Sequence, residues 1–178
     1  MFKKISLAII AALFLSVASP AIAAEALTLD IEKIFSNSKA GQSLIGQIKT
    51  RAEALQATRD KAQKELEGDA KKIDEQKTLL TQEALRAKAD DLRLKEIAKN
   101  QELQQELRKL EASQLTARNE ILKALQPILK DVMAEKKASM IMEKRAVLIS
   151  SPDIDVTDIV VKRLDGVLTS VTLKDPKN

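Results

Sequence analysis

Asp30 and Glu32 are the carboxylates that a hydrolase would use in this sequence. Such an enzyme holds two carboxyl groups at a defined separation in a fixed cleft, one as the acid and the other as base or nucleophile. The other acidic residues are instead spread along segments rich in helix formers, where they would be solvated. The chain has no His and no Cys, which excludes the common zinc and copper sites and the Ser or Cys triads. We therefore predict no enzyme, no metal site and no cofactor.

The overall composition points to a protein that gains its stability from packing or assembly. Its 178 residues include 30 Lys and Arg and 26 Asp and Glu, for a net charge of +4. This near balance does not predict nucleic-acid binding. Because the chain has no Cys, disulfides cannot stabilise it, and a small domain then depends on its core or on contacts between copies.

The beginning of the chain predicts a cleavable signal peptide over residues 1–23. Two lysines precede the apolar run ISLAIIAALFLSV, which is too short to span a bilayer. Pro20 ends any helix, and the AIA motif that follows it has the small residues that signal peptidase accepts. Cleavage after Ala23 is the favoured interpretation, and cleavage after Ala26 is the alternative. We therefore predict an exported protein.

Residues 38–137 are dominated by strong helix formers, with Gly68 and Pro127 as the strong breakers beyond Gln47. Apolar residues recur there at near-heptad spacing, which is typical of a coiled-coil seam rather than of a globular helix face. The first series comprises Leu44, Ile48, Leu55, Ala62, Leu66, Ile73 and Leu80. The second comprises Leu85, Leu92, Leu103, Leu107, Leu110, Ala117, Ile121, Ala124, Ile128 and Val132.

The helical segment is expected to fold back on itself. A single rod of roughly 100 residues would hold its two ends about 150 Å apart. Because the short strands that flank the segment must meet if they are to pair, we predict an antiparallel helical hairpin, or arm, over residues 39–137. Its tip is expected near residues 79–83, where Thr81 could cap the second helix.

Pro127 interrupts the second helix of the predicted hairpin. A proline in a helix interior removes one backbone hydrogen bond and costs about 3 kcal/mol if nothing compensates. Two interpretations stay open, a kink where the arm enters the body and a plain helix break. The kink would leave an apolar group to pack into the core beyond it, namely Ile128, Leu129, Val132 and Met133.

The two ends of the chain, residues 24–38 and 138–178, are expected to form a small body. The sequence LTLDI at 27–31 alternates as a strand does, and SMIMEKRAVLISS at 139–151 predicts a β-hairpin. A final helix should follow the turn after residue 151.

Polar residues mark the expected ends of these helices. Ser36 or Ser38 is the predicted N-cap of the first arm helix, and Asp155 is that of the final helix, with Asp158 in its first turn. The last six residues, LKDPKN, are expected to fray.

A body of about 55 residues buries only a limited core and commonly needs oligomerisation for stability. The strand and the hairpin would make three strands with open edges, which neighbouring copies could close into a small barrel. The residues expected in this oligomerisation body are Leu27, Leu29, Ile31, Met140, Ile141, Met142, Val147, Leu148 and Ile149.

Three stretches, taken in order, resemble the Skp/OmpH-like family of periplasmic chaperones. They are LTLDIEKIFSNSKAG, with Asp30, Ile34, Ser38 and Gly41; LLTQEALRAK at the tip; and ASMIMEKRAVLISSPDIDVTDIVVKRL, with Asp155 and Thr157 in a D-x-T motif. The resemblance covers essentially the whole mature chain. It implies a mainly α fold with a small β body, in which a long antiparallel coiled-coil tentacle projects from a β-barrel-like trimerisation body. It also implies an ATP-independent periplasmic holdase that keeps unfolded outer-membrane β-barrel proteins in a cavity between the arms of a homotrimer.

A holdase of this kind would contact its client through many weak apolar contacts. The candidate client-binding residues are Leu79, Leu80, Leu85, Leu92, Leu94, Ile97, Lys71, Lys72, Lys88 and Arg93. For the apolar residues other than Leu94, a place in the coiled-coil seam is the more ordinary interpretation, and for the basic ones it is a solvated face.

Some members of the family have distinctly basic tips that contact membranes or lipopolysaccharide. Here the basic residues near the tip are offset by Asp and Glu residues, so the sequence does not predict membrane or lipopolysaccharide contact at the tip. A different class also stays open, a structural coiled-coil adaptor or spacer of the cell envelope that binds one folded partner. Such an adaptor would bind its partner saturably and would not suppress the aggregation of unrelated unfolded barrels.

Overall fold

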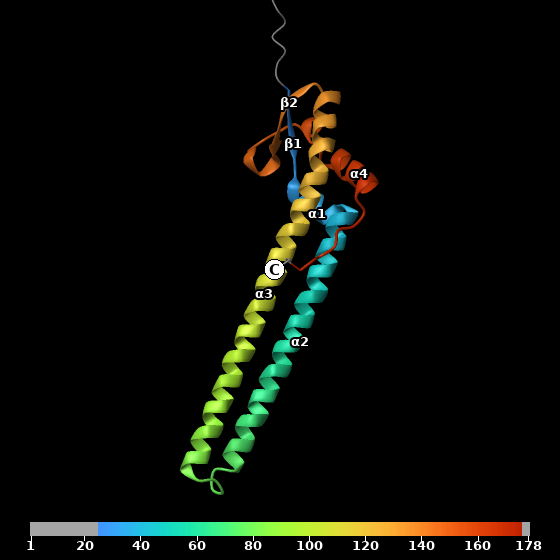
Figure 1. Cartoon of the computed structure of the whole chain (residues 1–178). Helices are drawn as coiled ribbons and strands as arrows, with labels where there is room; N and C mark the ends of the chain where they lie inside the picture. Colours follow the sequence, from blue (N-terminus) through green and yellow to red (C-terminus); the bar gives the residue numbers. More distant parts are fainter. Residues whose placement is uncertain (1–24, 176–178) are drawn as a thin grey trace, which may run out of the picture.

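The structure is a computed structural model that describes residues 25–175. The predicted signal peptide and the cleavage site after Ala23 lie outside these described residues. Two long helices form an arm, and the two ends of the chain meet in a small body at one end of it (Figure 1).

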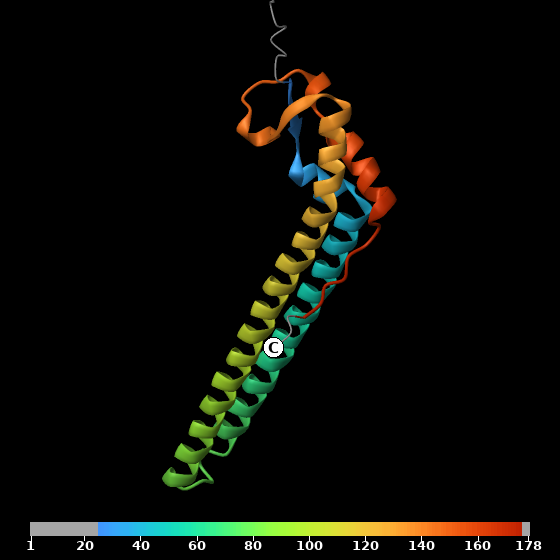
Figure 2. The same cartoon turned by 45° about the horizontal axis from the view of Figure 1, so that its top comes forward.

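The arm is the predicted antiparallel hairpin rather than a single rod. Helix α2 (Lys39–Glu75) and helix α3 (Gln82–Glu135) lie side by side along their lengths in both views (Figures 1 and 2). Both predicted N-caps are confirmed, because Ser38 Oγ accepts a hydrogen bond from Gly41 N at 3.1 Å and Thr81 Oγ1 accepts one from Ala84 N at 3.3 Å. A side-chain oxygen at this position satisfies an amide that the helix leaves unpaired.

The interpretation of Pro127 as a plain helix break is wrong, because α3 continues through this residue to Glu135. Beyond the proline, Ile128 and Val132 are buried in the core, and Leu129 packs against it. The packing of this apolar face supplies stability that offsets the lost backbone hydrogen bond.

The two ends of the chain pair as predicted, but as two parallel strands. Strand β1 (Glu25–Leu29) lies beside β2 (Ala138–Glu143), with Leu27 opposite Ile141 and Leu29 opposite Glu143. Ile31 was expected in the strand, but it is the first residue of helix α1 (Ile31–Asn37).

The predicted β-hairpin over residues 139–151 is wrong. After β2 the chain enters a short 3₁₀ helix, η1 (Lys144–Ala146), and Val147, Leu148 and Ile149 are not in a strand. The 3₁₀ turn does not return the chain alongside β2. Within the described part of one chain, two side chains of the expected second strand have no cover, since Leu148 is 105% and Ile149 90% exposed.

The core forms where α1, the near ends of α2 and α3, and helix α4 (Thr157–Val167) meet. Its most deeply buried side chains include Leu27, Ile34, Ile121, Leu125, Val160 and Leu164. Gly41 allows α1 and α2 to approach each other, because a Cβ atom there would lie 1.9 Å from the carbonyl oxygen of Phe35.

Asp155 does not cap α4 as predicted, because the N-cap residue is Val156. Asp155 lies one residue earlier, where its Oδ1 accepts hydrogen bonds from the backbone amide and the hydroxyl of Thr157. Asp158 forms an ion pair with Lys33 of α1 at 2.8 Å. A second 3₁₀ helix, η2 (Pro152–Ile154), occupies the predicted turn.

The chain after α4 is packed rather than frayed over residues 168–175, which corrects the expectation for the start of the LKDPKN tail. This C-terminal segment runs in extended form along α2 (Figure 2). Val171 is buried in the core, and Leu168 and Leu173 pack against it. Apolar residues just before the polar tail therefore hold the segment in place.

Candidate binding surface on the arm

The seam between the arm helices is tight near the body and loose beyond it. On the body side, α3 has a continuous buried row that comprises Leu110, Ser113, Ala117, Ile121, Leu125, Ile128 and Val132. In the described distal arm, residues 49–107, Ala62 alone is buried. The apolar seam residues of the distal arm are therefore still partly in contact with solvent.

The buried row differs from the predicted seam at three positions, of which one is Ser113, a buried residue that the predicted seam does not include. Leu125 is buried where Ala124 was expected, and Leu107 is exposed although it was assigned to the seam. An α-helix has 3.6 residues per turn, so a strict heptad pattern drifts around its surface with length.

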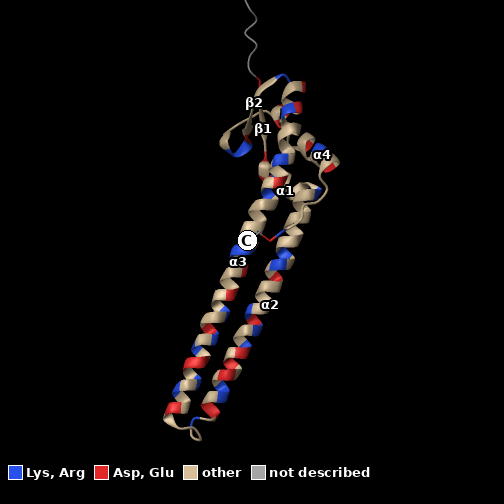
Figure 3. Ribbon diagram, in the orientation of Figure 1, with Lys and Arg blue, Asp and Glu red and all other residues tan. Residues whose placement is uncertain are grey.

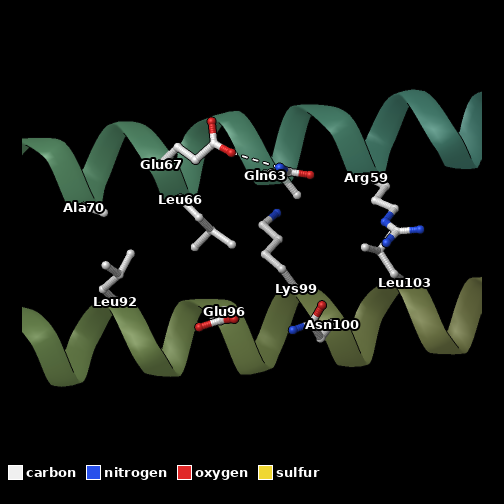
Figure 4. Close-up of a pocket in the computed structure, with 11 residues that line it drawn as sticks. Arg59, Gln63, Leu66, Glu67, Ala70, Leu92, Glu96, Lys99, Asn100 and Leu103 are labelled. Atoms are coloured by element: carbon white, nitrogen blue, oxygen red, sulfur yellow. Dashed lines mark hydrogen bonds between the residues drawn. The ribbon is translucent and has the colours of Figure 1, made fainter.

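Cavities lie between the two helices in the loose part of the seam. One of about 410 Å³ is lined by Leu66, Leu92 and Leu103 among others, and Figure 4 shows Leu66 and Leu92 extending into the space between the ribbons. Another, of about 320 Å³, continues toward the body past Leu55 and ends at Leu110. Polar side chains such as Arg59, Gln63 and Asn100 border the first cavity.

The candidate apolar residues occupy two different environments. Leu79 at the tip is 84% exposed, Leu94 is 66% exposed, and Ile97 is also exposed. By contrast, Leu80, Leu85 and Leu92 are half-buried. The structure therefore separates an outward-facing apolar set from a set that belongs to the loose seam.

Three of the candidate residues lie around one cavity near the tip. Lys72, Lys88 and Leu92 line it together, and Leu92 and Arg93 line a neighbouring one. Lys71 lies apart from both and is near Glu75, at 4.0 Å.

Carboxylates offset much of the positive charge near the tip. Lys95 lies 3.2 Å from Asp91 and 3.4 Å from Asp69, and Lys72 lies 3.5 Å from Asp69. A hydrogen bond from Lys95 lowers the pKa of the Asp69 carboxyl, and hydrogen bonds to Asp91 and Asp69 raise the pKa of Lys95. Both groups therefore stay charged at neutral pH, and the two signs alternate along both helices (Figure 3).

Leu115 was missed by the sequence reasoning. It is 61% exposed on α3, and it follows Leu94 by 21 residues, which is three heptads. Residues three heptads apart lie on nearly the same face of a coiled-coil helix. The spacing could therefore have placed Leu115 with Leu94 on an outer row.

Asp30 and Glu32, the candidate hydrolase carboxylates, both make structural contacts. Asp30 Oδ1 accepts a hydrogen bond from Lys33 N at 2.9 Å and so caps α1. Glu32 forms an ion pair with Arg145. Neither carboxylate lines any of the cavities described above.

The residues predicted for the oligomerisation body fall into three groups. Leu27 and Leu29 are buried in the core of a single chain, and Ile31, Ile141 and Val147 are half-buried. The others, Met140, Met142, Leu148 and Ile149, are exposed. The last group is an apolar surface that one copy of the chain leaves open to solvent.

Comparison with known proteins decides the family. The family model described as outer membrane protein (OmpH-like) matches residues 26–164. The chain belongs to the OmpH-like family. The match includes β1, both arm helices and most of α4, and it confirms the resemblance drawn from the sequence.

A solved structure has the same fold. The crystal structure of a Caulobacter crescentus protein, described as a candidate outer membrane chaperone (OmpH-like), superposes on this OmpH-like chain with a TM-score of 0.78. The two are 24% identical, and the match covers 86% of this chain and 90% of the other. No curated protein matches the sequence significantly. Within residues 25–175, no helix is long and apolar enough to cross a membrane.

Proposed function

We propose that this OmpH-like protein is an ATP-independent holdase of the periplasm that binds unfolded outer-membrane β-barrel proteins between its arms. The predicted signal peptide would direct export and would then be removed. The observation that carries the proposal is the set of large apolar side chains that the arm leaves exposed, Ile45, Leu79, Leu94, Ile97, Leu107 and Leu115. Membership of the OmpH-like family, and the description of the Caulobacter protein, support it.

The arm suits a client without fixed structure. Its outer apolar residues are separated by charged ones, so a client segment would meet several weak contacts rather than one pocket. Weak contacts enclosed in a small volume sum to useful affinity through effective concentration. Release then needs no nucleotide, because each contact breaks readily by itself.

The loose distal seam adds a second kind of contact. Leu85 and Leu92 are half-buried, and Leu92 lines cavities between α2 and α3, so small movements of the helices would expose them further. Lys71, Lys72, Lys88 and Arg93 would attract acidic client segments, and this attraction would weaken with salt.

We propose further that three copies assemble through the body, residues 24–38 and 138–178, and that residues 39–137 of each copy form an arm around a shared cavity. β2 has one open edge, and Met140, Met142, Leu148 and Ile149 form an exposed apolar surface beside it. Exposed edges and apolar patches of this kind are commonly covered by another chain.

The function is tested by diluting a urea-unfolded outer-membrane barrel into buffer with and without the purified mature protein. Without nucleotide, we expect the protein to keep the barrel soluble, as measured by turbidity and by centrifugation. Unchanged aggregation would contradict a holdase. Saturable binding of one folded envelope protein, with no effect on aggregation, would instead support the adaptor.

A further inference from the structure

The C-terminal segment, residues 168–175, makes a contact that does not depend on its side chains. Gln47 of α2 donates a hydrogen bond from Nε2 to the carbonyl of Val171 at 2.7 Å and accepts one at Oε1 from the amide of Leu173 at 3.0 Å. Both ends of one side-chain amide thus hold the extended backbone of the segment. Because Val171 is also buried, the segment is fixed in a single register along α2.

The end of the same segment joins a charged cluster that spans both arm helices. We name Arg51, Glu106, Lys109 and Asp175 the base cluster. Arg51 of α2 pairs with Asp175 of the segment and lies 3.8 Å from Glu106 of α3, which in turn pairs with Lys109 at 2.7 Å. The Arg51 side chain is only 26% exposed and that of Glu106 35%, so this pair is partly shielded from solvent, whereas Lys109 and Asp175 are exposed.

The base cluster lies at the level of the arm where the tight seam ends. Lys109 immediately precedes Leu110, the outermost member of the buried row of α3, and Glu106 lies about one turn before it. On the other helix, no side chain from 45 to 61 is buried within the described part of the chain. The core cluster extends to Ala117 on α3 and to Leu44 on α2, with Ile48 packed against it. The base cluster therefore lies beyond the part of the arm that the core holds together.

We propose that residues 168–175 act as a clasp that holds α2 against α3 at the base of the arm. The clasp adds an attachment beyond the reach of the core, through Gln47 and through Arg51, which contacts both Asp175 and Glu106. It limits how far the two helices separate or bend beyond Leu110. This role concerns the arm itself, so it holds whether or not the arm binds unfolded clients. The family match ends at residue 164, so the clasp lies outside the matched region.

Hydrogen exchange of the full mature chain tests the clasp. In Gln47→Ala we expect the amides of residues 45–61 to exchange on the order of tenfold faster, because two hydrogen bonds to the segment are lost. A chain that ends at Leu168 should show a larger increase. In both of these variants, the amides of residues 117–132 should exchange at the same rate as in the parent. Gln42→Ala and Lys174→Ala, which change neighbouring exposed residues, serve as matched controls and should behave as the parent.

A distance measurement gives a second, independent readout. Because the chain has no Cys, spin labels can be placed at Lys64→Cys and Gln101→Cys, one on each helix, in assemblies diluted with unlabelled chains. Removal of the clasp should broaden the distance distribution between the labels. Parent-like exchange at 45–61 in Gln47→Ala and an unchanged distribution in the shortened chain would overturn the proposal. Faster exchange at residues 117–132 in the shortened chain would mean that its body is disturbed. The exchange of residues 45–61 in Gln47→Ala would then be the deciding measurement.

Discussion

The backbone amide of Asp30 donates a hydrogen bond to the hydroxyl of Thr157 at 2.9 Å, across 127 residues of sequence. The same hydroxyl donates a hydrogen bond to Oδ1 of Asp155. Oδ2 of that carboxylate accepts a hydrogen bond from Lys144 at 2.6 Å. This network joins the first turn of α1 to the first turn of α4. The D-x-T motif and the aspartate after the first strand are therefore parts of one structural feature.

Replacing Thr157 with Val should destabilise the body by about 1–3 kcal/mol, because it leaves the buried end of this network without its hydroxyl. The change keeps the shape of the side chain. Urea unfolding of the parent and the variant measures the difference. Thr116→Val is the matched control, because that exposed hydroxyl bonds only to the Ala112 carbonyl within its own helix, and equal losses in both variants would refute a special role for Thr157.

Acid should weaken the body through Asp155. Partial burial raises the pKa of this carboxyl, but hydrogen bonds from Lys144 and from Thr157 outweigh that effect and lower its pKa to about 2. The folded form therefore binds the proton less readily than the unfolded chain, in which the pKa is about 3.9. The resulting stabilisation, on the order of 2 kcal/mol, is complete above about pH 4 and is lost as the pH falls toward 2.

Free energies of unfolding measured from pH 6 to pH 2 check this prediction. In Asp155→Asn the carboxyl no longer titrates, so the variant should be less stable at pH 6, and the difference from the parent should shrink toward pH 2. A difference that stays constant over this range would show that Asp155 acts only through packing.

Gly41→Ala should be strongly destabilising, by about 2 kcal/mol or more, because its Cβ would overlap the carbonyl of Phe35. Gly46→Ala lies one and a half turns further along the same helix, and a Cβ there meets nothing within 4 Å. That control should be neutral or stabilise by up to about 1 kcal/mol through helix propensity. Thermal unfolding of the two variants compares them, and a similar loss in both would contradict the close approach of α1 and α2.

Replacing the exposed apolar side chains of Leu94 and Leu115 should weaken holdase activity and leave the free energy of unfolding unchanged. The double variant Leu94→Gln and Leu115→Gln changes only exposed side chains, so its unfolding curve should match that of the parent. The protein concentration needed to keep a barrel soluble should rise several-fold, since each lost apolar contact contributes on the order of 1 kcal/mol. Full activity in this variant would place client contacts elsewhere on the arm.

The basic candidates call for a salt-dependent measurement. Replacing Lys71, Lys72, Lys88 and Arg93 with Glu should weaken client affinity at low salt and have less effect at high salt. Binding of a labelled unfolded barrel at two salt concentrations measures this. Unchanged affinity at low salt would mean that these residues form a solvated face and nothing more.

The parts of the fold that local patterns determine were predictable from the sequence. Helix formers, the caps at Ser38 and Thr81, and the need to bring two short strands together were enough to predict the hairpin. The seam was predicted less well, because the rotation of a long helix decides whether Ala124 or Leu125 faces inward.

The errors concern features that depend on distant or missing partners. Residues 147–149 are a short run of β-branched and apolar residues of the kind that forms a strand. Within the described part of one chain, however, this stretch has no strand partner, and Leu148 and Ile149 have no cover. The contact of Gln47 with the C-terminal segment joins residues over 120 positions apart, and no local pattern signals it. Which exposed apolar residues contact a client depends on the client, so the sequence pattern could set Leu94 apart from the seam but could not order the other candidates.

The most direct test of trimeric holdase function is the mass of the complex formed when the mature protein meets an unfolded outer-membrane barrel. Light scattering should be read by refractive index, because the chain has no Trp or Tyr. We expect a soluble species whose mass equals three copies of this chain and one barrel protein. A free monomer that elutes separately from aggregated barrel would contradict both the trimer and its proposed function.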